Sequence, residues 1–239
     1  PGPRTHHQLR RECAAAMNRR HECGYGVLVP IKSLRRAKSR LTIGSSSLRS
    51  ELAMAFFLDT IAALKASSQV ESIVVVSPDP AVGRAVGRSC DVVSDPELGL
   101  AEAIRAGAAR LQSIGHRGPA AVVLPDLPCA TARSFDALFA AASHHPRAFV
   151  SDWKGDGTTC VTAATVVLLT HHFGESSAAA HACHGFVPIE LSIPDLRADV
   201  DTPSDMRRMQ ASELGSTTRS ILARSIGAIP EAKAEIATR

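Results

Sequence analysis

The chain is poor in aromatic residues, with one Trp, one Tyr and seven Phe among 239 residues. None of them alternates with Lys or Arg, so the stacking platform typical of a protein that binds single-stranded nucleic acid is missing. The formal net charge of +4 does not restore that interpretation, because residues 1–23 carry five Arg against two Glu and account for +3 of it. We therefore do not expect nucleic-acid binding.

Long apolar runs and paired cysteines are missing too. The longest apolar stretches, such as 161–169, fall far short of the roughly 20 residues that span a bilayer, so no membrane passage is expected. The six cysteines are scattered and form no Cys-x-x-Cys pair, which favours a reducing, cytoplasmic setting.

The segment before Met17 is rich in Arg and His but lacks the apolar stretch of a secretory signal, so we expect Met17 to be the natural start and 1–16 to be dispensable.

The remaining composition, with 45% apolar residues, is enough for the core of one α/β domain. We expect a basic, disordered leader over 1–23, a single domain over 24–213, and a helix or tail over 214–239. Short β-rich runs alternate with helical patterns, which predicts a mostly parallel sheet with helices between its strands. The expected strands are 26–30, 72–77, 91–93, 120–124 and 148–150, and the expected helices are 48–64, 79–89, 100–113, 131–143, 176–184 and 203–213.

A basic loop follows the first expected strand. Residues 32–40 hold five cations, namely Lys32, Arg35, Arg36, Lys38 and Arg40, and no Gly. The loop is therefore not the glycine-rich phosphate cradle of a P-loop or dinucleotide fold. Long cationic side chains at the carboxyl end of a strand suit a triphosphate, whose charge they neutralise during transfer. A solvated basic loop is the alternative, and only the position in the fold favours the functional interpretation.

Two acidic motifs follow later in the chain. Asp126 ends an apolar strand between Pro125 and Pro128, while Asp199 and Asp201 stand at i and i+2, which in an extended segment places them on one side, roughly 6.5–7 Å apart. Together the three carboxylates could hold Mg²⁺, a hard cation that takes oxygen ligands and is often shared with substrate phosphates. An Asp near a Pro is more often a turn or cap residue, so only the combination with the basic loop indicates a phosphate site.

A glycine-rich segment, 152–159 (DWKGDGTT), offers flexible backbone and hydroxyls that suit a small anionic acceptor, although a hairpin turn explains the same residues. Residues 173–177 (FGESS) open an expected helix whose start could take a carboxylate or phosphate, or could simply be capped by Ser.

The ten histidines match no ordinary zinc pattern, and we expect most of them to be exposed. No Gly-x-Ser-x-Gly elbow is present, which removes the main argument for a serine hydrolase.

Taken in order, these motifs resemble the phosphoenolpyruvate or 2-phospho-L-lactate guanylyltransferases of coenzyme F-420 biosynthesis, from Val27 to about Met209. The opening loop VPIKSLRRAKSRL and the closing motif DVDTP are the more specific matches, and LPDLP, GDGTT and FGESS lie between them. The resemblance implies a three-layer α/β/α, Rossmann-like fold of the nucleotide-diphospho-sugar-transferase type, with GTP as donor and a small phosphorylated carboxylic acid as acceptor. A homodimer is left open.

The resemblance also implies roles for single residues. Lys38 and Arg40 would be catalytic, Pro30, Lys32, Lys38 and Arg40 would bind the nucleotide, Thr158, Gly174 and Ser177 would bind the acceptor, and Asp126, Asp199 and Asp201 would hold Mg²⁺. The chain departs from the family pattern at three places. Pro125 stands where the family often has Gly, Ala101 where it has Asn, and Ala180 where an Arg usually precedes the residue matched by His181. The departures affect the metal loop, a nucleotide contact and an acceptor contact.

The expected reaction is an in-line attack of an acceptor phosphate oxygen on the α-phosphorus of the triphosphate. A phosphate monoester is already largely dianionic at neutral pH, so no general base is needed. Charge neutralisation and alignment of two anions are what the site must supply. Two other interpretations are a nucleotidyltransferase with another base or acceptor, such as a molybdenum-cofactor guanylyltransferase, and a non-catalytic nucleotide-binding module. The glycine-free opening loop counts against the former, and the intact aspartates count against the latter.

Overall fold

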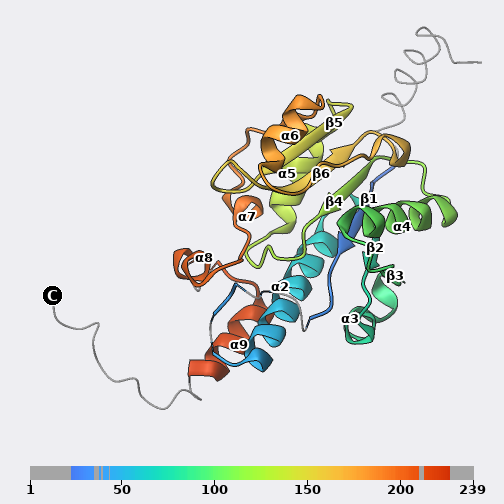
Figure 1. The fold of residues 1–239 in the computed structure, drawn as a ribbon. Coiled ribbons are helices and arrows are strands. Elements are labelled where there is room, and N and C mark those ends of the chain that lie inside the picture. Colours follow the sequence, from blue (N-terminus) through green and yellow to red (C-terminus); the bar gives the residue numbers. More distant parts are fainter. Residues whose placement is uncertain (1–22, 35–37, 39, 43, 210–212, 227–239) are drawn as a thin grey trace, which may run out of the picture.

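A seven-stranded sheet runs through the centre of the computed structural model, which describes residues 23–34, 38, 40–42, 44–209 and 213–226 (Figure 1). The strand order is β3-β2-β1-β4-β6-β5-β7. All neighbouring strands pair in parallel except where β6 pairs with β4 and β5, so β6 alone is reversed in this sheet. The strands are β1 (Tyr25–Pro30), β2 (Val70–Val76), β3 (Asp91–Val93), β4 (Ala120–Val123), β5 (Arg147–Ser151), β6 (Thr158–Ala163) and β7 (Val187–Pro188).

Helices cover both faces of this sheet. The larger core cluster joins one face to α2 (Ser46–Ala66), α3 (Pro80–Val86), α5 (Ala132–Ala142) and α7 (Pro194–Arg197). The second cluster joins the opposite face to α4 (Leu100–Ser113), η3 (Val166–Leu168) and α6 (Ser177–Cys183). The short elements η2 (Gly87–Ser89) and α8 (Pro203–Arg208) and the helix α9 (Ser216–Ile226) complete the described structure.

Strand β1 shows why the sheet lies in the middle. All six of its residues are buried, and successive side chains point to opposite faces. Val27 and Val29 pack with α2 and α5, whereas Leu28 packs with α4 on the other face. A strand that is apolar on both faces is typical of a parallel sheet covered on both sides. The three-layer α/β/α fold expected from the sequence is therefore confirmed.

Several elements differ from the sequence expectation. Strand β6, β7 and α7 were not expected, and α8 ends at Arg208, short of residue 213. The loop 152–157 does join two antiparallel strands, β5 and β6, so the hairpin explanation of the glycine-rich segment holds for its backbone. Residues 216–226 form a helix, while the leader over 1–22 and the end of the chain after 226 lie outside the described residues. No helix among the described residues is long and apolar enough to cross a membrane.

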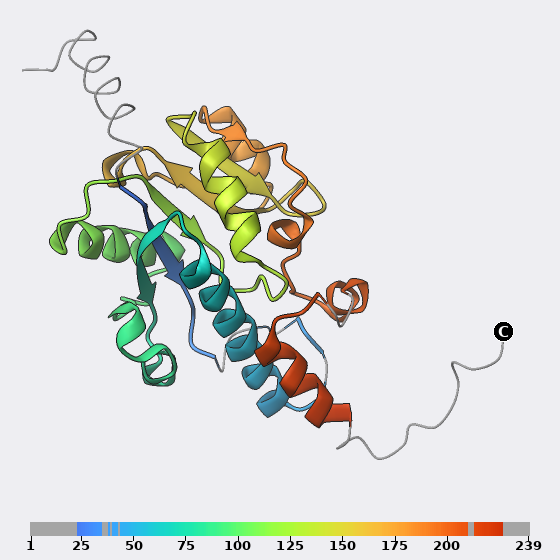
Figure 2. The same cartoon turned by 180° about the vertical axis from the view of Figure 1, so that it is seen from behind.

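Helix α9 lies beside α2 in both views of the ribbon (Figures 1 and 2). Asp59, in the middle of α2 and only 6% exposed, accepts hydrogen bonds from the backbone N–H groups of Thr217 (2.9 Å) and Thr218 (2.8 Å). Those groups belong to the first turn of α9 and have no partner inside the helix. Gly215 fits this contact closely, since a Cβ there would lie 2.2 Å from the Asp59 Cγ. A side chain of α2 therefore caps a helix more than 150 residues later in the chain.

Asp59→Ala should lower the free energy of unfolding by about 2 kcal/mol, because two buried N–H groups lose a charged acceptor. Urea unfolding followed by circular dichroism measures this change. Glu51→Gln is the matched control on the same helix, since its ion pair with Arg224 is long (3.8 Å) and exposed and should change stability by less than about 0.5 kcal/mol. Equal stability of the two variants would show that Asp59 does not anchor α9.

Candidate active site

A cavity of about 700 Å³ opens at the carboxyl ends of β1 to β4. This is the edge at which ligands bind in open α/β sheets. The strand order reverses between β1 and β4, because β2 and β3 lie on one side of β1 and its parallel neighbour β4 lies on the other. The cavity is lined by Pro30, Ile31, Lys32, Ser33, Lys38, Arg40, Ala53, Pro78, Asp95, Glu97, Gly99, Leu100, Ala103, Leu124, Pro125, Asp126 and Asp201. All four residues predicted to bind the nucleotide lie in this lining, together with Asp126.

A second cavity of about 620 Å³ adjoins the first. It lies against the β5–β6 loop, the segment before α6, and the segment that leads into α8. Four residues, Arg40, Leu100, Leu124 and Asp201, line both cavities. The other lining residues are Asp152, Trp153, Lys154, Asp156, Gly157, Thr158, Phe173, Gly174, Glu175, Ser177, Asp199, Thr202 and Asp205. All three residues predicted to bind the acceptor lie here, with two of the three predicted metal ligands.

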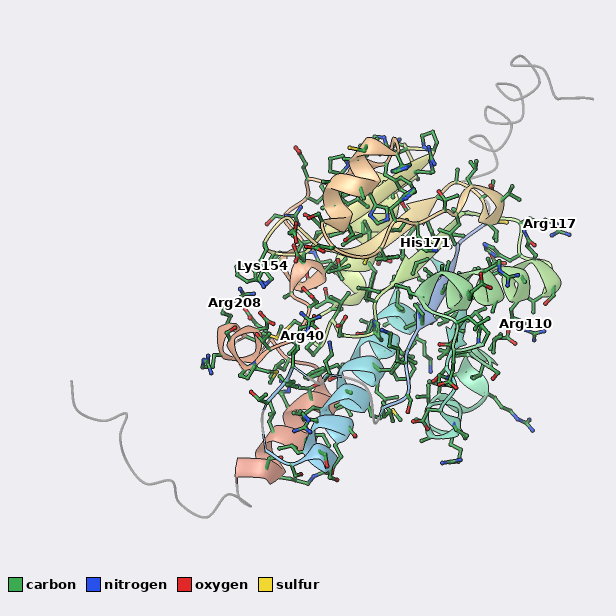
Figure 3. The ribbon with its side chains drawn as sticks, viewed as in Figure 1. Arg40, Arg110, Arg117, Lys154, His171 and Arg208 are labelled. Carbon is green, nitrogen blue, oxygen red and sulfur yellow. The ribbon has the colours of Figure 1, made fainter. Side chains whose placement is uncertain are left out.

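Figure 3 shows Arg40, Lys154 and Arg208 on one side of the molecule, well away from Arg110 and Arg117. Arg208, from α8, places its guanidinium 3.1 Å from the centroid of the Trp153 ring. The backbone N–H of Trp153 donates to the Arg197 carbonyl at 2.9 Å. These contacts fix the β5–β6 loop against the segment that carries Asp199 and Asp201. Trp153 is still 46% exposed, so it can report on what enters the second cavity.

Lys38 joins three segments that are far apart in the sequence. Its ammonium donates to the Asp126 carboxylate and, at 2.9 Å, to Asp201 Oδ1. Burial alone would lower the pKa of Lys38, but the two carboxylates more than offset it and raise the pKa above its ordinary value. The backbone of Lys38 is left-handed (φ 55°), which is strained for a residue with a Cβ and is held by these ion pairs. Arg40 is exposed and lies 3.9 Å from the other Asp201 oxygen.

The turn that carries Asp126 is fixed from two sides. The Thr60 hydroxyl of α2, fully buried, accepts from the backbone N–H of Leu127 at 3.2 Å. The backbone N–H of Val200 donates to the Asp126 carbonyl at 3.2 Å, and the Val200 side chain is itself fully buried. Burying Val200 leaves its neighbours Asp199 and Asp201 at the cavity wall. The two acidic motifs are thus joined through their backbones.

The chemistry of these carboxylates fits a divalent cation. Asp126 Oδ1 is buried and has no hydrogen-bond partner among the described residues. Burial, and then the Asp126 and Asp201 carboxylates, raise the pKa of Asp199 to about 7. Concentrated negative charge of this kind is what a hard cation relieves. No three His, Cys, Asp or Glu side chains in the described part of the chain are arranged as a ready-made metal cage, so joint binding by the three aspartates stays a prediction.

On the acceptor side, Thr158 and Ser177 surround a buried histidine. The Ser177 hydroxyl donates to Thr158 Oγ1 at 3.2 Å, and His181 Nδ1 lies 3.1 Å from that same oxygen. Gly174 has a φ of 144°, which a residue with a side chain rarely adopts, so a Gly is required there. His181 is 0% exposed, and among the seven histidines in the described part of the chain only His144 and His184 are exposed, contrary to the expectation that most histidines are exposed.

His181, which contacts Thr158 and Ser177, and the Asp95–Glu97 loop are parts of the site that the sequence did not reveal. Asp95 and Glu97 come from the loop between β3 and α4 and line the first cavity. An isolated pair of acids in a loop has no distinguishing pattern. For His181 one signal was available, because a His four residues after a Ser on a short helix can bond the Ser carbonyl, as it does here at 2.7 Å. Arg35 and Arg36 of the basic loop lie outside the described residues.

The fold is of the nucleotide-diphospho-sugar-transferase-like class. The structure is similar to a crystal structure described as a nucleotide-diphospho-sugar transferase of Desulfovibrio desulfuricans G20, with a TM-score of 0.65, 14% identity, and coverage of 86% of this chain and 96% of that one. It is also similar to a nucleotidyl transferase of Methanothermobacter, with a TM-score of 0.56, 14% identity, and coverage of 80% and 97%. At these identities the likeness concerns the fold.

Sequence comparison places the chain more narrowly. Residues 44–185 match the MobA-like NTP transferase domain. The chain is 40% identical over 198 residues to phosphoenolpyruvate guanylyltransferase 2 of Rhodococcus jostii, covering 83% of this chain and 90% of that protein. It is 39% identical over 202 residues to the phosphoenolpyruvate guanylyltransferase of Streptomyces coelicolor, covering 83% and 95%. The chain therefore belongs to the phosphoenolpyruvate guanylyltransferase family, and the resemblance seen in its motifs is confirmed.

Burial, which is the largest cause, lowers the pKa of His181 to about 4, below the roughly 6.5 of an exposed histidine. A depressed folded-state pKa contributes stability that is fully present above pH 6.5 and is lost as the pH falls toward 4. Between pH 7.5 and pH 5 the loss should be on the order of 2 kcal/mol. His181→Phe, which cannot titrate, should lack this part of the pH dependence.

Urea unfolding of both proteins at pH 7.5, 6 and 5 measures this difference. His184→Gln is the matched control on the same helix end, because that ring is exposed. It should keep the pH dependence of the unchanged protein. The same slope in His181→Phe and in the unchanged protein would rule out a buried neutral His181.

Proposed function

We propose that this chain transfers GMP from GTP to phosphoenolpyruvate and releases pyrophosphate, with 2-phospho-L-lactate and 3-phosphoglycerate as alternative acceptors. The observation that carries the proposal is the pair of adjoining cavities that share Arg40 and Asp201. One cavity is large enough for a nucleotide and presents three cations beside four carboxylates. The other presents hydroxyls and glycines from a separate loop beside six carboxylates. The names of the relatives support the choice of donor and acceptor.

Within this proposal, the nucleotide takes the first cavity with its phosphates toward Lys32, Lys38 and Arg40. The acceptor takes the second, with its phosphate toward the shared wall. Two anions that repel each other must be brought within reacting distance, which costs free energy that the cations and the fixed geometry offset. Arg40 is suited to stabilise charge that develops between the two substrates, because it lines both cavities.

The reaction forms one bond and breaks one. An oxygen of the acceptor phosphate attacks the α-phosphorus, and the bond from that phosphorus to the oxygen bridging to the β-phosphorus breaks. Pyrophosphate leaves with the electron pair of that bond. The attacking phosphate is already largely dianionic at neutral pH, so no proton has to be removed by a side chain. Lys38 and Arg40 would neutralise the negative charge that grows on the leaving pyrophosphate.

Mg²⁺ belongs to the proposal, with Asp126, Asp199 and Asp201 as its ligands. When bound, the cation would supply further positive charge at the phosphate oxygens. The support is the uncommitted Asp126 Oδ1 and the cluster of carboxylates that raises the pKa of Asp199. Lys38, which is paired with Asp126 and Asp201, holds the three segments in place around them.

The wider setting is part of the same proposal. The product would be the guanylylated acid used in coenzyme F-420 biosynthesis, as the family resemblance implies. A cytoplasmic location is supported by Cys23, Cys90, Cys129, Cys160 and Cys183, which are all free thiols in the described part of the chain.

Pyrophosphate release tests the proposal directly. Each of the four nucleoside triphosphates is combined with each of the three acids in the presence of Mg²⁺. GTP with phosphoenolpyruvate should give the highest kcat/KM, because each substrate then fits its own cavity. Faster release with 2-phospho-L-lactate or 3-phosphoglycerate would reassign the acceptor, and faster release with another triphosphate would reassign the donor. Binding of GTP without release for any acid would favour a nucleotide-binding module.

Asp126→Asn and Asp201→Asn should each lower kcat by about 100-fold or more, because each removes a charge that aligns Lys38 and the proposed cation. Asp91→Asn is the matched control, since Asp91 pairs with Arg110 on another part of the surface. Adding EDTA to the unchanged protein should abolish release, and excess Mg²⁺ should restore it. Retained turnover in EDTA would remove Mg²⁺ from the mechanism, and retained turnover in both variants would remove the two aspartates.

A further inference from the structure

The two nitrogens of His181 have fixed roles. The backbone N–H of His172 donates to Nε2 at 2.9 Å, so Nε2 must carry a lone pair and no proton. Nδ1 lies 2.7 Å from the Ser177 carbonyl oxygen, which can only accept, so Nδ1 must carry the proton. Backbone groups on both sides therefore select one neutral tautomer. The ring is also held by Phe149, Phe173 and Phe186, whose centroids lie 5.6, 5.4 and 5.1 Å away.

This tautomer determines what the neighbouring hydroxyls can do. Since Nδ1 supplies a proton, it cannot accept one from Thr158, whose Oγ1 lies 3.1 Å away. Thr158 and Ser177 together have two hydroxyl protons and use one of them in their mutual hydrogen bond of 3.2 Å. No other bond involving either hydroxyl is found in the described part of the chain, and both residues line the second cavity. One hydroxyl proton is thus left to point into that cavity.

We propose that His181 is a positioning residue that holds the Thr158 hydroxyl, which accepts from Ser177, as a hydrogen-bond donor to an anionic oxygen of the phosphorylated acid. The inference rests on the proposed function, because it takes that acid to be the occupant of the second cavity. A hydroxyl that has an alternative acceptor nearby spends part of its time bonded to it. Because Nδ1 carries a proton, His181 is no such acceptor, and its N–H, 3.1 Å from Thr158 Oγ1, instead occupies a lone pair of that oxygen. The Thr158 hydroxyl proton is then directed to the cavity, and a ring without this N–H would lose that orientation.

His181 acts through the hydroxyls, so its effect should depend on them. Thr158→Val removes the donor and should raise the KM for phosphoenolpyruvate about 10- to 100-fold, the range for one hydrogen bond to a charged group. His181→Phe keeps a ring of similar size among the three phenylalanines and should raise the same KM about 10-fold. His181→Asn returns a donor near the Nδ1 position and should recover part of this loss. The KM for GTP should stay within about two-fold of the unchanged protein in all three variants.

The double variant Thr158→Val with His181→Phe separates positioning from general support of the fold. If His181 works through the hydroxyls, the double variant has the KM of Thr158→Val alone. A KM that multiplies the two single effects, or a rise in the KM for GTP, would overturn the inference. His184→Gln is the control, since it too bonds the carbonyl four residues earlier (2.8 Å) but does not contact either hydroxyl, and it should leave both KM values unchanged.

Two further measurements keep the outcome decisive. Trp153 is the chain's single Trp and lines the second cavity, so its fluorescence follows phosphoenolpyruvate binding without turnover. If the unchanged protein neither releases pyrophosphate nor binds an acid, the proposed function fails and the inference fails with it. If it does both, the inference stands or falls on the variants alone. Should His181→Phe fail to fold, His181→Asn is compared with the unchanged protein and with its own double variant carrying Thr158→Val. A double variant with the KM of Thr158→Val alone supports the inference, and a KM that multiplies the two single effects would overturn it.

Discussion

The ion pairs of Lys38 with Asp126 and Asp201 are the interaction on which the site depends. They join the loop after β1, the turn after β4 and the segment before α8. Lys38 is 88 residues from Asp126 in the sequence and 163 residues from Asp201. The Lys38 side chain is 9% exposed, so its charge is tolerated only because two carboxylates face it. Removing either partner would leave an uncompensated charge near the bottom of the cleft. Balanced charge therefore fixes the geometry at which the two cavities meet.

The rest of the fold holds the partners of this cluster in place. Helix α2 supplies the Thr60 hydroxyl that supports the Asp126 turn, and the same helix supplies Asp59, which caps α9. Leu41, Leu52, Phe56 and Val200 form a small core between α2, the basic loop and the closing acidic segment. One long helix thus contacts the three segments that carry Lys38, Asp126 and Asp201. This arrangement explains how an opening loop without glycine can be ordered at Lys38 despite its left-handed backbone.

The parts of the fold that the sequence predicted are those with a local signal. Strands β1 to β5 and helix α4 follow apolar runs and periodic patterns, and α4 begins and ends where the pattern does. Strand β6 was missed because three of its six residues are Thr, without regular alternation, and because it follows a glycine-rich loop. All six are buried, and Thr159 is satisfied by the Leu196 carbonyl at 2.6 Å, a contact far away in sequence. Strand β7 has two residues and gives no pattern.

The residues of the site also divide into those with a local sequence signal and those without one. The predicted residues were found as charged or hydroxylated side chains at strand ends, and the structure brings them to two adjoining cavities. His181 could not be assigned a part in this way, because its roles come from the His172 backbone and from Thr158, which lies 23 residues earlier. Local sequence shows only a histidine on a short helix. Contacts with the surrounding structure, and not the adjacent residues, keep the His181 ring neutral and fix the directions of its hydrogen bonds.

A neutral His181 also suits the chemistry better than a charged one would. The acceptor phosphate has to remain a nucleophile, and a cation placed against its attacking oxygen would hold the electrons that must form the new bond. A neutral donor orients an anion with less of this cost. On the leaving side the requirement is reversed, because negative charge grows there and full positive charge helps. The structure separates the two needs in space. Lys38 lines the first cavity, where it pairs with Asp126 and Asp201, whereas Thr158 and Ser177 line the second cavity with the buried His181 against their hydroxyls.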